Sequence, residues 1–487
     1  MLNINDQQVG QEREESIRPA TADMAPEPGD YLLISTWRRN KAAYILFITL
    51  SLTHLHFFTA TGLATIPITV FYMFLAALSP VLLLKLYNRE AVVEYTLTVL
   101  LALVVTVNYF AHLGEIRITT IIFSMMYIFY FFIAINTIRT MTPRDFITIA
   151  KVVIYLYLLN VVVSLVELYL GIKLDVFGVF NGLSYDRRYN VDRLCGFASE
   201  PSYAAIIIAT THILSSRLSL SLGEKRSPYL ITASIFMMVA FKSVYGYLLL
   251  IMLFLEEMHV MRQQDRYRKT RNSMVFPGLV ISGVLFILLM GILIQQSAAG
   301  SRLAEVASRL FSEGLYGLQG YEGGTWVRIK LALDFFSFFL RGTLWEMIFG
   351  IGAGSASLLF GEEYGRTVGM WQAGMYTMNI GGWGYFLDYG LIGTASLIYV
   401  FYKVAFKGWH SMILITVTWT NAGFNEMLFW YVFTCLMVIV HFDKVKAKIE
   451  RAHRWAEPQR QDIFARDVNS EASSSPASGS PPPEAHG

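Results

Sequence analysis

The chain has 487 residues, of which 54% are hydrophobic and only 15% are charged, and its formal net charge is +3. A soluble protein of this length cannot bury so much apolar surface and still present a polar exterior. The composition therefore excludes a soluble globular enzyme, a disulfide scaffold and a fully disordered chain. It favours an all-α, polytopic membrane protein.

The first 40 residues precede any apolar segment. Residues 1–30 are polar and acidic, contain proline, and lack the apolar core of a secretory signal. We therefore expect residues 1–40 to form a disordered tail on the cytoplasmic side.

The middle of the chain, residues 41–445, contains apolar segments long enough to cross a bilayer, which takes about 20 residues per helix. The candidates lie near 43–60, 64–86, 91–110, 118–138, 149–171, 202–216, 228–241, 244–258, 275–295, 380–402, 409–421 and 426–442. Some are short, and 228–258 and 409–442 are also compatible with re-entrant helices. The prediction is about 12 transmembrane helices, within a range of about 10 to 14.

Lysine and arginine in the short connections set the expected orientation. With twelve spans, every connection rich in these residues falls on one side of the membrane, which is then the cytoplasmic side, together with both termini. The opposite side receives two longer loops, at about 172–200 and 296–379. The second is too long for a plain connector and too aromatic for a disordered linker. The end of the chain, 446–487, contains a Ser/Pro-rich stretch and is expected to be an unstructured cytoplasmic tail.

Charged residues gather just before the sixth span, within R-R-Y-N-V-D-R-L-C-G-F-A-S-E-P-S-Y. Arginine binds phosphate in a bidentate manner, and positive charge is normally depleted on the outer side. Pro201 keeps Glu200 out of the helical conformation and suits the first turn of the next helix. The alternatives are that Arg193 simply pairs with Glu200 or that the arginines bind lipid headgroups. The candidate residues of this segment are Arg187, Arg188, Arg193, Glu200, Ser202 and Tyr203.

Further candidates lie elsewhere on the outer side. Arg328 follows Trp326 in the long loop, where the pair suits either substrate binding or an interfacial helix anchored by tryptophan. Lys242 falls between two short apolar segments, either at the interface or inside the bundle. Asp388 falls inside an apolar span, where an unpaired carboxylate is costly. One of the arginines is a candidate partner, and the pair is either structural or part of the site.

Several kinds of site are not indicated by any motif. There is no phosphate-binding G-x-x-x-x-G-K-[ST] loop and no H-E-x-x-H or Cys/His cluster, so we expect neither a metal nor a cofactor. The two cysteines, Cys195 and Cys435, have no metal-ligand spacing and are expected to pack in the apolar interior.

Three short motifs resemble those of bacterial O-antigen and exopolysaccharide polymerases of the Wzy type, in the superfamily that includes the O-antigen ligases. R-L-C-G-F-A-S-E-P-S resembles the R-x-x-G-x-x-x-E-P-S element, and F-G-I-G-A-G-S is similar to the G-x-G stretch of the long periplasmic loop. L-D-Y-G-L-I-G resembles the E-x-G-l-i-G element, with Asp388 in place of the commoner glutamate. The resemblance covers roughly residues 40 to 440.

The resemblance implies a metal-independent, lipid-dependent glycosyltransferase with a GT-C-like fold in the bacterial inner membrane. Its substrate would be an oligosaccharide on undecaprenyl diphosphate, polymerised on the periplasmic face into O-antigen, capsule or exopolysaccharide. Arg193 and Arg328 would neutralise the leaving diphosphate, assisted by Arg187 or Arg188, and Glu200 or Asp388 would activate the attacking hydroxyl. Whether a chain-length regulator or a flippase of the same pathway binds the chain stays open.

Two alternatives are kept. The ligases carry a histidine in the long loop, but this chain has none between His259 and His410, which favours a polymerase. A transporter for lipid-linked oligosaccharide or another solute would have charged pairs inside its spans and an internal repeat. The sequence indicates neither feature, so the transporter is the less favoured alternative.

Overall fold

The computed structural model divides the chain into two compact units, one of Leu33–Phe442 and one of Met1–Leu32 with Asp443–Gly487. Its described residues are 91–112, 118–170, 183–186, 191–198, 200–224, 227–241, 243–263, 340–356, 381–422 and 426–473, with short pieces at 47–48, 51, 56–58 and 65–67 and isolated helical residues at 308, 312 and 337.

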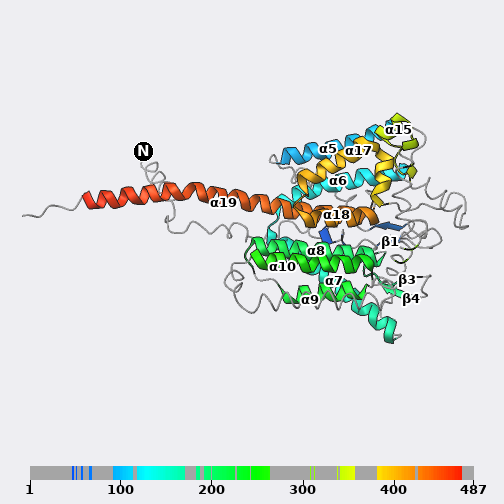
Figure 1. The fold of residues 1–487 in the computed structure, drawn as a ribbon, viewed down its shortest axis with the longest axis horizontal. Helices are drawn as coiled ribbons and strands as arrows, with labels where there is room; N and C mark the ends of the chain where they lie inside the picture. Colours follow the sequence, from blue (N-terminus) through cyan, green and yellow to red (C-terminus); the bar gives the residue numbers. More distant parts are fainter. Residues whose placement is uncertain are drawn as a thin grey trace, which may run out of the picture. The chain divides into compact units, whose positions relative to one another are not determined.

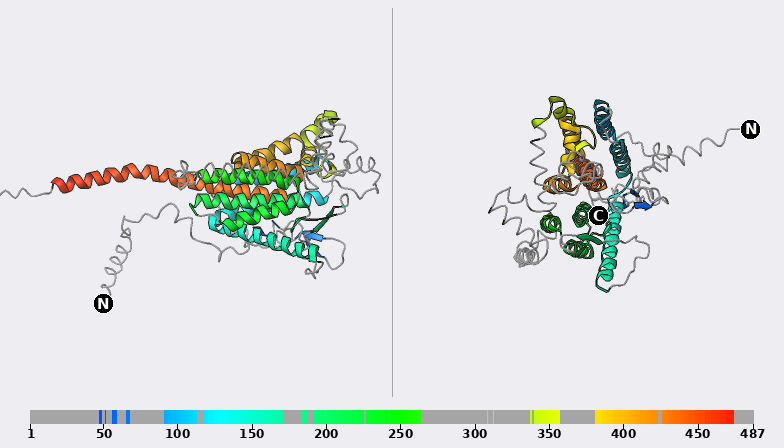
Figure 2. Two further views of the ribbon diagram at one scale, coloured as in Figure 1. Left: turned by 60° about the horizontal axis from the view of Figure 1, so that its bottom comes forward. Right: turned by 90° about the vertical axis from the view of Figure 1, so that its right-hand side faces the viewer.

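The larger unit is a helical bundle (Figures 1 and 2). Its helices are α5 (Val92–Ala111), α6 (Ile118–Thr140), α7 (Pro143–Leu170), α8 (Pro201–Ser221), α9 (Pro228–Ala240), α10 (Val244–Gln263), α15 (Leu344–Phe349), α17 (Gly381–Val404), α18 (Trp409–Asn421) and the first part of α19 (Met427–Ser473). Proline is the first residue of α7, α8 and α9, where its fixed φ suits the helix and its missing N–H has no intrahelical acceptor.

Five described helices are long and apolar enough to cross a membrane, namely α5, α7, α8, α17 and the start of α19. The chain is therefore a helical membrane protein with several spans. The segments predicted at 91–110, 118–138, 149–171, 202–216, 228–241, 244–258, 380–402 and 409–421 all fall on helices, whereas 275–295 lies outside the described residues. The total of about twelve spans therefore stays a prediction.

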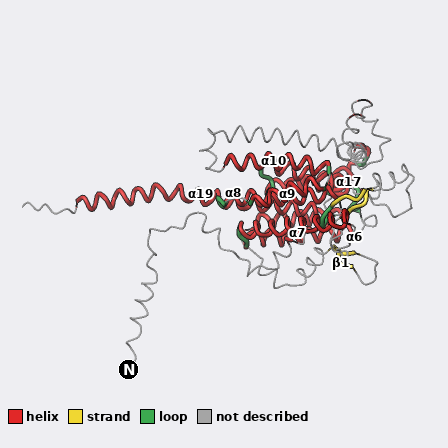
Figure 3. The backbone as a smooth tube through the Cα atoms, turned by 90° about the horizontal axis from the view of Figure 1, so that it is seen from below, coloured by secondary structure: helices red, strands yellow, loops and turns green. Residues whose placement is uncertain are grey.

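Two short hairpins occur where helices or a plain loop were expected. β1 (His56–Phe58) pairs antiparallel with β2 (Thr65–Pro67), so these residues are extended although the sequence predicted spans at 43–60 and 64–86. β3 (Leu183–Asp186) pairs antiparallel with β4 (Val191–Leu194) inside the loop predicted at 172–200. Both hairpins lie at the same end of the bundle as α15 (Figure 1), and in the described part of the chain the strands occur at that end (Figure 3). We call it the hairpin end.

The core is formed by two groups of helices with α18 and the start of α19 between them. α5 packs on α6 and α17, while α8 packs on α7, α9, α10 and α18. Trp430 of α19 is fully buried and stacks on Tyr127 of α6, with ring centroids 6.0 Å apart. Phe433, one helical turn later, meets Phe131 edge to face at 5.4 Å. Such aromatic contacts contribute about 0.5–1.5 kcal/mol each beyond area burial.

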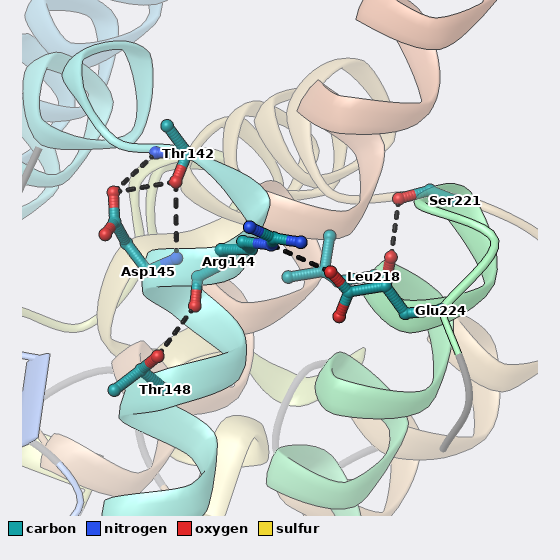
Figure 4. A network of polar contacts seen from close by, with 7 residues as sticks. All are labelled: Thr142, Arg144, Asp145, Thr148, Leu218, Ser221 and Glu224. Atoms are coloured by element: carbon teal, nitrogen blue, oxygen red, sulfur yellow. Dashed lines mark hydrogen bonds and ion pairs between the residues drawn. The ribbon is translucent and has the colours of Figure 1, made fainter. Parts of the chain in front are cut away.

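The opposite end of the bundle is fixed by polar contacts between α7 and the residues after α8 (Figure 4). The backbone N–H and hydroxyl of Thr142 both donate to Asp145 Oδ2, each at 2.9 Å, which caps α7. Arg144 Nε donates to Glu224 Oε1 at 2.8 Å. Because both side chains are partly exposed, the ion pair contributes only about 0–1 kcal/mol. It nevertheless joins two connections that the distribution of lysine and arginine placed on one side of the membrane.

The smaller unit is described only from Asp443 to Ser473, where α19 remains helical. The sequence predicted an unstructured tail from residue 446, and that prediction is wrong for residues 446–473. The Ser/Pro-rich stretch begins only near its end, and the preceding residues are dominated by alanine, lysine, arginine and glutamate, which are good helix formers.

Candidate functional site

A tight turn at Gly196 connects β4 to α8. Gly196 has φ +58°, in the left-handed region that favours glycine, and a Cβ there would lie 2.6 Å from Cδ1 of Tyr157. The Tyr157 ring is held in place because its hydroxyl donates to Ser51 O at 2.6 Å and Phe197 packs edge to face on it. Gly196 is the glycine of the R-x-x-G element, and its role is to seat this turn against α7.

Glu200 lies at the N-cap of α8, with φ −140° and ψ 152°, and Pro201 is the first helical residue. This confirms the expectation that the proline excludes Glu200 from the helix. The Glu200 side chain is exposed, and its Oε2 accepts a hydrogen bond from the Ser202 hydroxyl at 3.2 Å. The carboxylate is thus presented at the hairpin end of the bundle.

Tyr203 brings a second carboxylate to the same place. Its hydroxyl lies 2.7 Å from Asn421 O and 2.8 Å from Glu426 Oε2. Because Ser202 and Tyr203 are adjacent in the first turn of α8, Glu200 and Glu426 lie at the same end of this helix. Sequence reasoning missed Glu426. The available signal was a carboxylate directly before the last apolar span.

The structure locates only part of the arginine cluster. Arg193 lies in β4, opposite Ser184 in the antiparallel register, and leads directly into the Gly196 turn. Its side chain is not described. The other predicted cationic and aromatic candidates, Arg187, Arg188, Lys242, Trp326 and Arg328, lie outside the described residues. Their roles therefore stay predictions.

Asp388 is buried in α17, but its described hydrogen-bond partners are backbone amides and not an arginine. Its Oδ2 accepts from Gly354 N and its Oδ1 from Ala356 N, both at 2.9 Å. These amides belong to the G-I-G-A-G-S-A turn (residues 350–356), whereas the side chains of the candidate arginines lie outside the described residues, so an arginine partner for Asp388 stays a prediction. Both carboxylate oxygens are engaged, which favours an anchoring role for Asp388 over a role as a base.

The same turn packs backbone to backbone on α17, where the helix is kinked at Gly390 (φ 63°, ψ −162°). A Cβ on Gly350 would lie 2.2 Å from Asp388 O, and one on Gly390 would lie 2.5 Å from Gly350 N. Asn108 of α5 links the turn to α17, because its side-chain amide donates to Asp388 O at 2.7 Å and accepts from Ala353 N at 3.0 Å. The glycines are required here for close approach of the two backbones.

Two buried ionic contacts lie inside the bundle, away from the hairpin end. Arg217 of α8 forms a salt bridge with the fully buried Glu256 of α10, although the span predicted at 202–216 ends just before Arg217. His212, one and a half turns earlier, lies with Nε2 2.9 Å from Glu257 Oε1. Charged pairs inside the spans are one of the two features expected of a transporter. The sequence alone had not indicated them.

The chain was compared with known protein families and with curated proteins, and neither comparison finds a match. Support for a function therefore comes from the geometry at the hairpin end, from the buried pairs and from the three short motifs. The site at the hairpin end comprises the Gly196 turn, Glu200 and Glu426. It also includes Arg193, of which only the backbone is described.

Proposed function

We propose that the chain polymerises oligosaccharide repeat units carried on a polyprenyl diphosphate, of which undecaprenyl diphosphate is the bacterial form. The observation that carries the proposal is the construction of the segment from Arg193 to Ser202. A strand ends in a glycine turn seated on Tyr157, and this turn presents the exposed carboxylate of Glu200 at the start of α8. The R-x-x-G-x-x-x-E-P-S resemblance thus coincides with a defined structural unit.

The chemistry follows from the charges of the substrate. A hydroxyl of the acceptor repeat attacks the anomeric carbon of the donor repeat, and the bond from that carbon to the diphosphate oxygen breaks. Arg193 and Arg328 neutralise the charge that develops on the leaving diphosphate. Glu200 receives the hydroxyl proton. Glu426, held by Tyr203 at the same end of α8, replaces Asp388 as the second candidate for orienting the acceptor.

The proposal also sets an orientation. The hairpin end faces the periplasm, where the lipid-linked repeats are polymerised, and the end with the Arg144–Glu224 pair faces the cytoplasm. This direction agrees with the preference of lysine and arginine for cytoplasmic connections.

The test is gel analysis of surface polysaccharide in cells that lack the gene and are complemented with variants of the full chain. Glu200→Gln and Arg193→Ala should leave single lipid-linked repeats, or one repeat on the final acceptor, with no long polymer. Glu346→Gln is the matched control, because Glu346 is a half-exposed carboxylate of α15 at the same end, where it accepts hydrogen bonds from Thr343 that a glutamine oxygen can still accept. Normal polymer length with Arg193→Ala and Arg193→Lys, or with Glu200→Gln, would contradict the assigned roles.

One observation favours a second candidate, a transporter of lipid-linked oligosaccharide or another solute. The Arg217–Glu256 and His212–Glu257 contacts place ionisable groups inside the bundle, which is typical of transport pathways. The same deletion strain separates the candidates. Repeat units trapped on the cytoplasmic side would indicate a transporter, and long polymer left on its lipid carrier would indicate a ligase.

A further inference from the structure

A polar pocket opens at the end of the bundle opposite the hairpins, between α7, α8 and α9. Its lining is formed by Ile147, Lys151, His212, Ser215, Ser216, Ser219, Glu224, Ser227, Leu230 and Ile231. The residues of the α8–α9 connection, Glu224 and Ser227, mark its mouth, and His212 lies deepest along α8. The pocket is separate from the site proposed for polymerisation.

His212 lies at the middle of a span. It is 11 residues from the first residue of α8, which corresponds to about 16 Å along the helix axis. Its side chain is only 4% exposed and that of Glu257 is 12% exposed. Taking an ionisable pair to this depth is costly, and such groups are retained in spans mainly for function.

Both ring nitrogens of His212 and Oε1 of Glu257 have partners that can exchange a proton. Glu257 Oε1 accepts from the Ser216 hydroxyl at 2.6 Å and lies 2.9 Å from His212 Nε2, while His212 Nδ1 lies 3.1 Å from Ser234 Oγ. With Glu257 ionised, Nε2 carries a proton and donates it, and Nδ1 accepts from the Ser234 hydroxyl. A second proton on Nδ1 needs only a rotation of that hydroxyl, which then becomes the acceptor.

A stripe of hydroxyl groups lies between the pair and the mouth of the pocket. His212, Ser215, Ser216 and Ser219 are spaced i, i+3, i+4 and i+7, so they lie on one face of α8. Each serine hydroxyl both donates and accepts, as a chain that passes protons requires. All four residues line the pocket, so the stripe runs from the middle of the span to its end.

Other charged and titratable groups lie in the pocket lining or on the helices that contact α8. They are Lys151 on α7, Arg217 on α8, Glu224 after α8, Glu256 and His259 on α10, His410 on α18, and Tyr431 on α19, which bonds Thr211. Arg217 is neutralised by Glu256, and Glu224 by Arg144, so no net charge of these pairs competes for the proton. Among the described residues, no group of three or more His, Cys, Asp or Glu side chains is placed to hold a metal ion.

We propose that His212 and Glu257 form a proton-binding site that is open to solvent only from the α8–α9 side of the bundle. The Ser216 hydroxyl passes its proton to Glu257 Oε1, which shares it with His212 Nε2, and takes up another from water in the pocket, so the pair gains one positive charge. The occupancy of the site therefore follows the pH on that side of the membrane. The proposal does not depend on polymerase activity, and its readouts contain none.

The first experiment measures protonation by infrared difference spectroscopy between about pH 5 and pH 8, on the purified full chain in liposomes. The wild-type difference spectrum should contain imidazole and carboxylate bands that are lost in both His212→Gln and Glu257→Gln. Ser234→Ala keeps both ionisable groups. It should retain the bands, but the pH at which their change is half complete should shift. His112→Gln, at the hairpin end of α5, is the histidine control and should leave them unchanged. Bands that persist in both Gln variants of the pair would overturn the proposal.

The second experiment measures access and does not require the pair to be altered. Ser219→Cys should react with a membrane-impermeant thiol reagent from the α8–α9 side only, on the order of ten times faster than Ser164→Cys. Ser164 is a buried serine of α7 outside the pocket, and the native Cys195 and Cys435 are buried and provide the blank. Equal rates for the two variants, or reaction of Ser219→Cys from the hairpin side, would refute a pocket open to one side.

Discussion

Replacing Gly196 by alanine tests whether the turn before α8 is seated on Tyr157. Gly223, which follows α8, is the matched control, because its φ of +65° is nearly the same as the +58° of Gly196. At both positions an alanine must adopt the left-handed conformation, which costs about 1–2 kcal/mol. A Cβ on Gly223 meets nothing within 4 Å, so no further penalty is expected there.

At Gly196 the new methyl group would lie 2.6 and 2.9 Å from two ring carbons of Tyr157. Carbon atoms pack best at about 3.5–4.0 Å, so the ring would have to move by about 1 Å. Tyr157 is fully buried and its hydroxyl is bonded to Ser51 O, so such a shift disturbs a packed region. Overpacking of this kind costs about 1–3 kcal/mol, which changes the ratio of unfolded to folded protein by a factor of roughly 5 to more than 100.

The assay is thermal unfolding in detergent, followed with a thiol-reactive dye. Cys195 and Cys435 are both buried, so the dye reports on loss of structure. Gly196→Ala should unfold at a clearly lower temperature than Gly223→Ala, and Cys195, the neighbouring residue, should react before Cys435. Equal stabilities within about 0.5 kcal/mol would show that the contact with Tyr157 does not shape the turn.

Three further predictions use the same unfolding assay. Asp388→Asn should lower the unfolding free energy by about 1–3 kcal/mol, because an amide nitrogen then faces a backbone N–H that had a carboxylate acceptor; an unchanged stability would contradict the anchoring role. Arg217→Met should lower the unfolding free energy by about 3–5 kcal/mol, and adding Glu256→Met should restore most of the lost stability. A double variant as unstable as the single variant would contradict a buried pair. Tyr203→Phe should cost about 1–2 kcal/mol and shorten the surface polysaccharide, because Glu426 loses a donor; full-length polymer would remove Glu426 from the site.

The helices were largely predictable because a membrane span leaves a long apolar segment in the sequence. The span expected at 91–110 is α5, Val92–Ala111, and that expected at 380–402 is α17, Gly381–Val404. The hairpins were missed because their strands are only three or four residues long, and an apolar stretch of that length also fits a helix. The helical part of the tail was missed because the prediction for residues 446–487 relied on the Ser/Pro-rich stretch, which occupies only the end of that range.

The candidate site was predictable where local chemistry determines the backbone. Pro201 indicated that Glu200 precedes α8, and the structure confirms it. Contacts between distant segments were not predictable. Tyr203 and Glu426 are separated by 223 positions in the sequence. The described partners of Asp388 are backbone amides, which every residue except proline has, so the sequence does not indicate which of them bind the carboxylate.

The buried Arg217–Glu256 pair has a consequence for the order in which the protein enters the membrane. The two residues are 39 positions apart, and an unpaired arginine costs about 2.5–3.5 kcal/mol at the centre of a span and less near its end, where Arg217 lies four residues before Ser221. At a synthesis rate of about 5–20 residues per second, Glu256 emerges about 2–8 s after Arg217. During that interval α8 lacks its counter-charge, so the Arg217 side chain has to extend to the headgroup region until α10 arrives. A ribosome that stalls between the two helices should therefore yield a chain in which Arg217 is more accessible to water than in the complete protein.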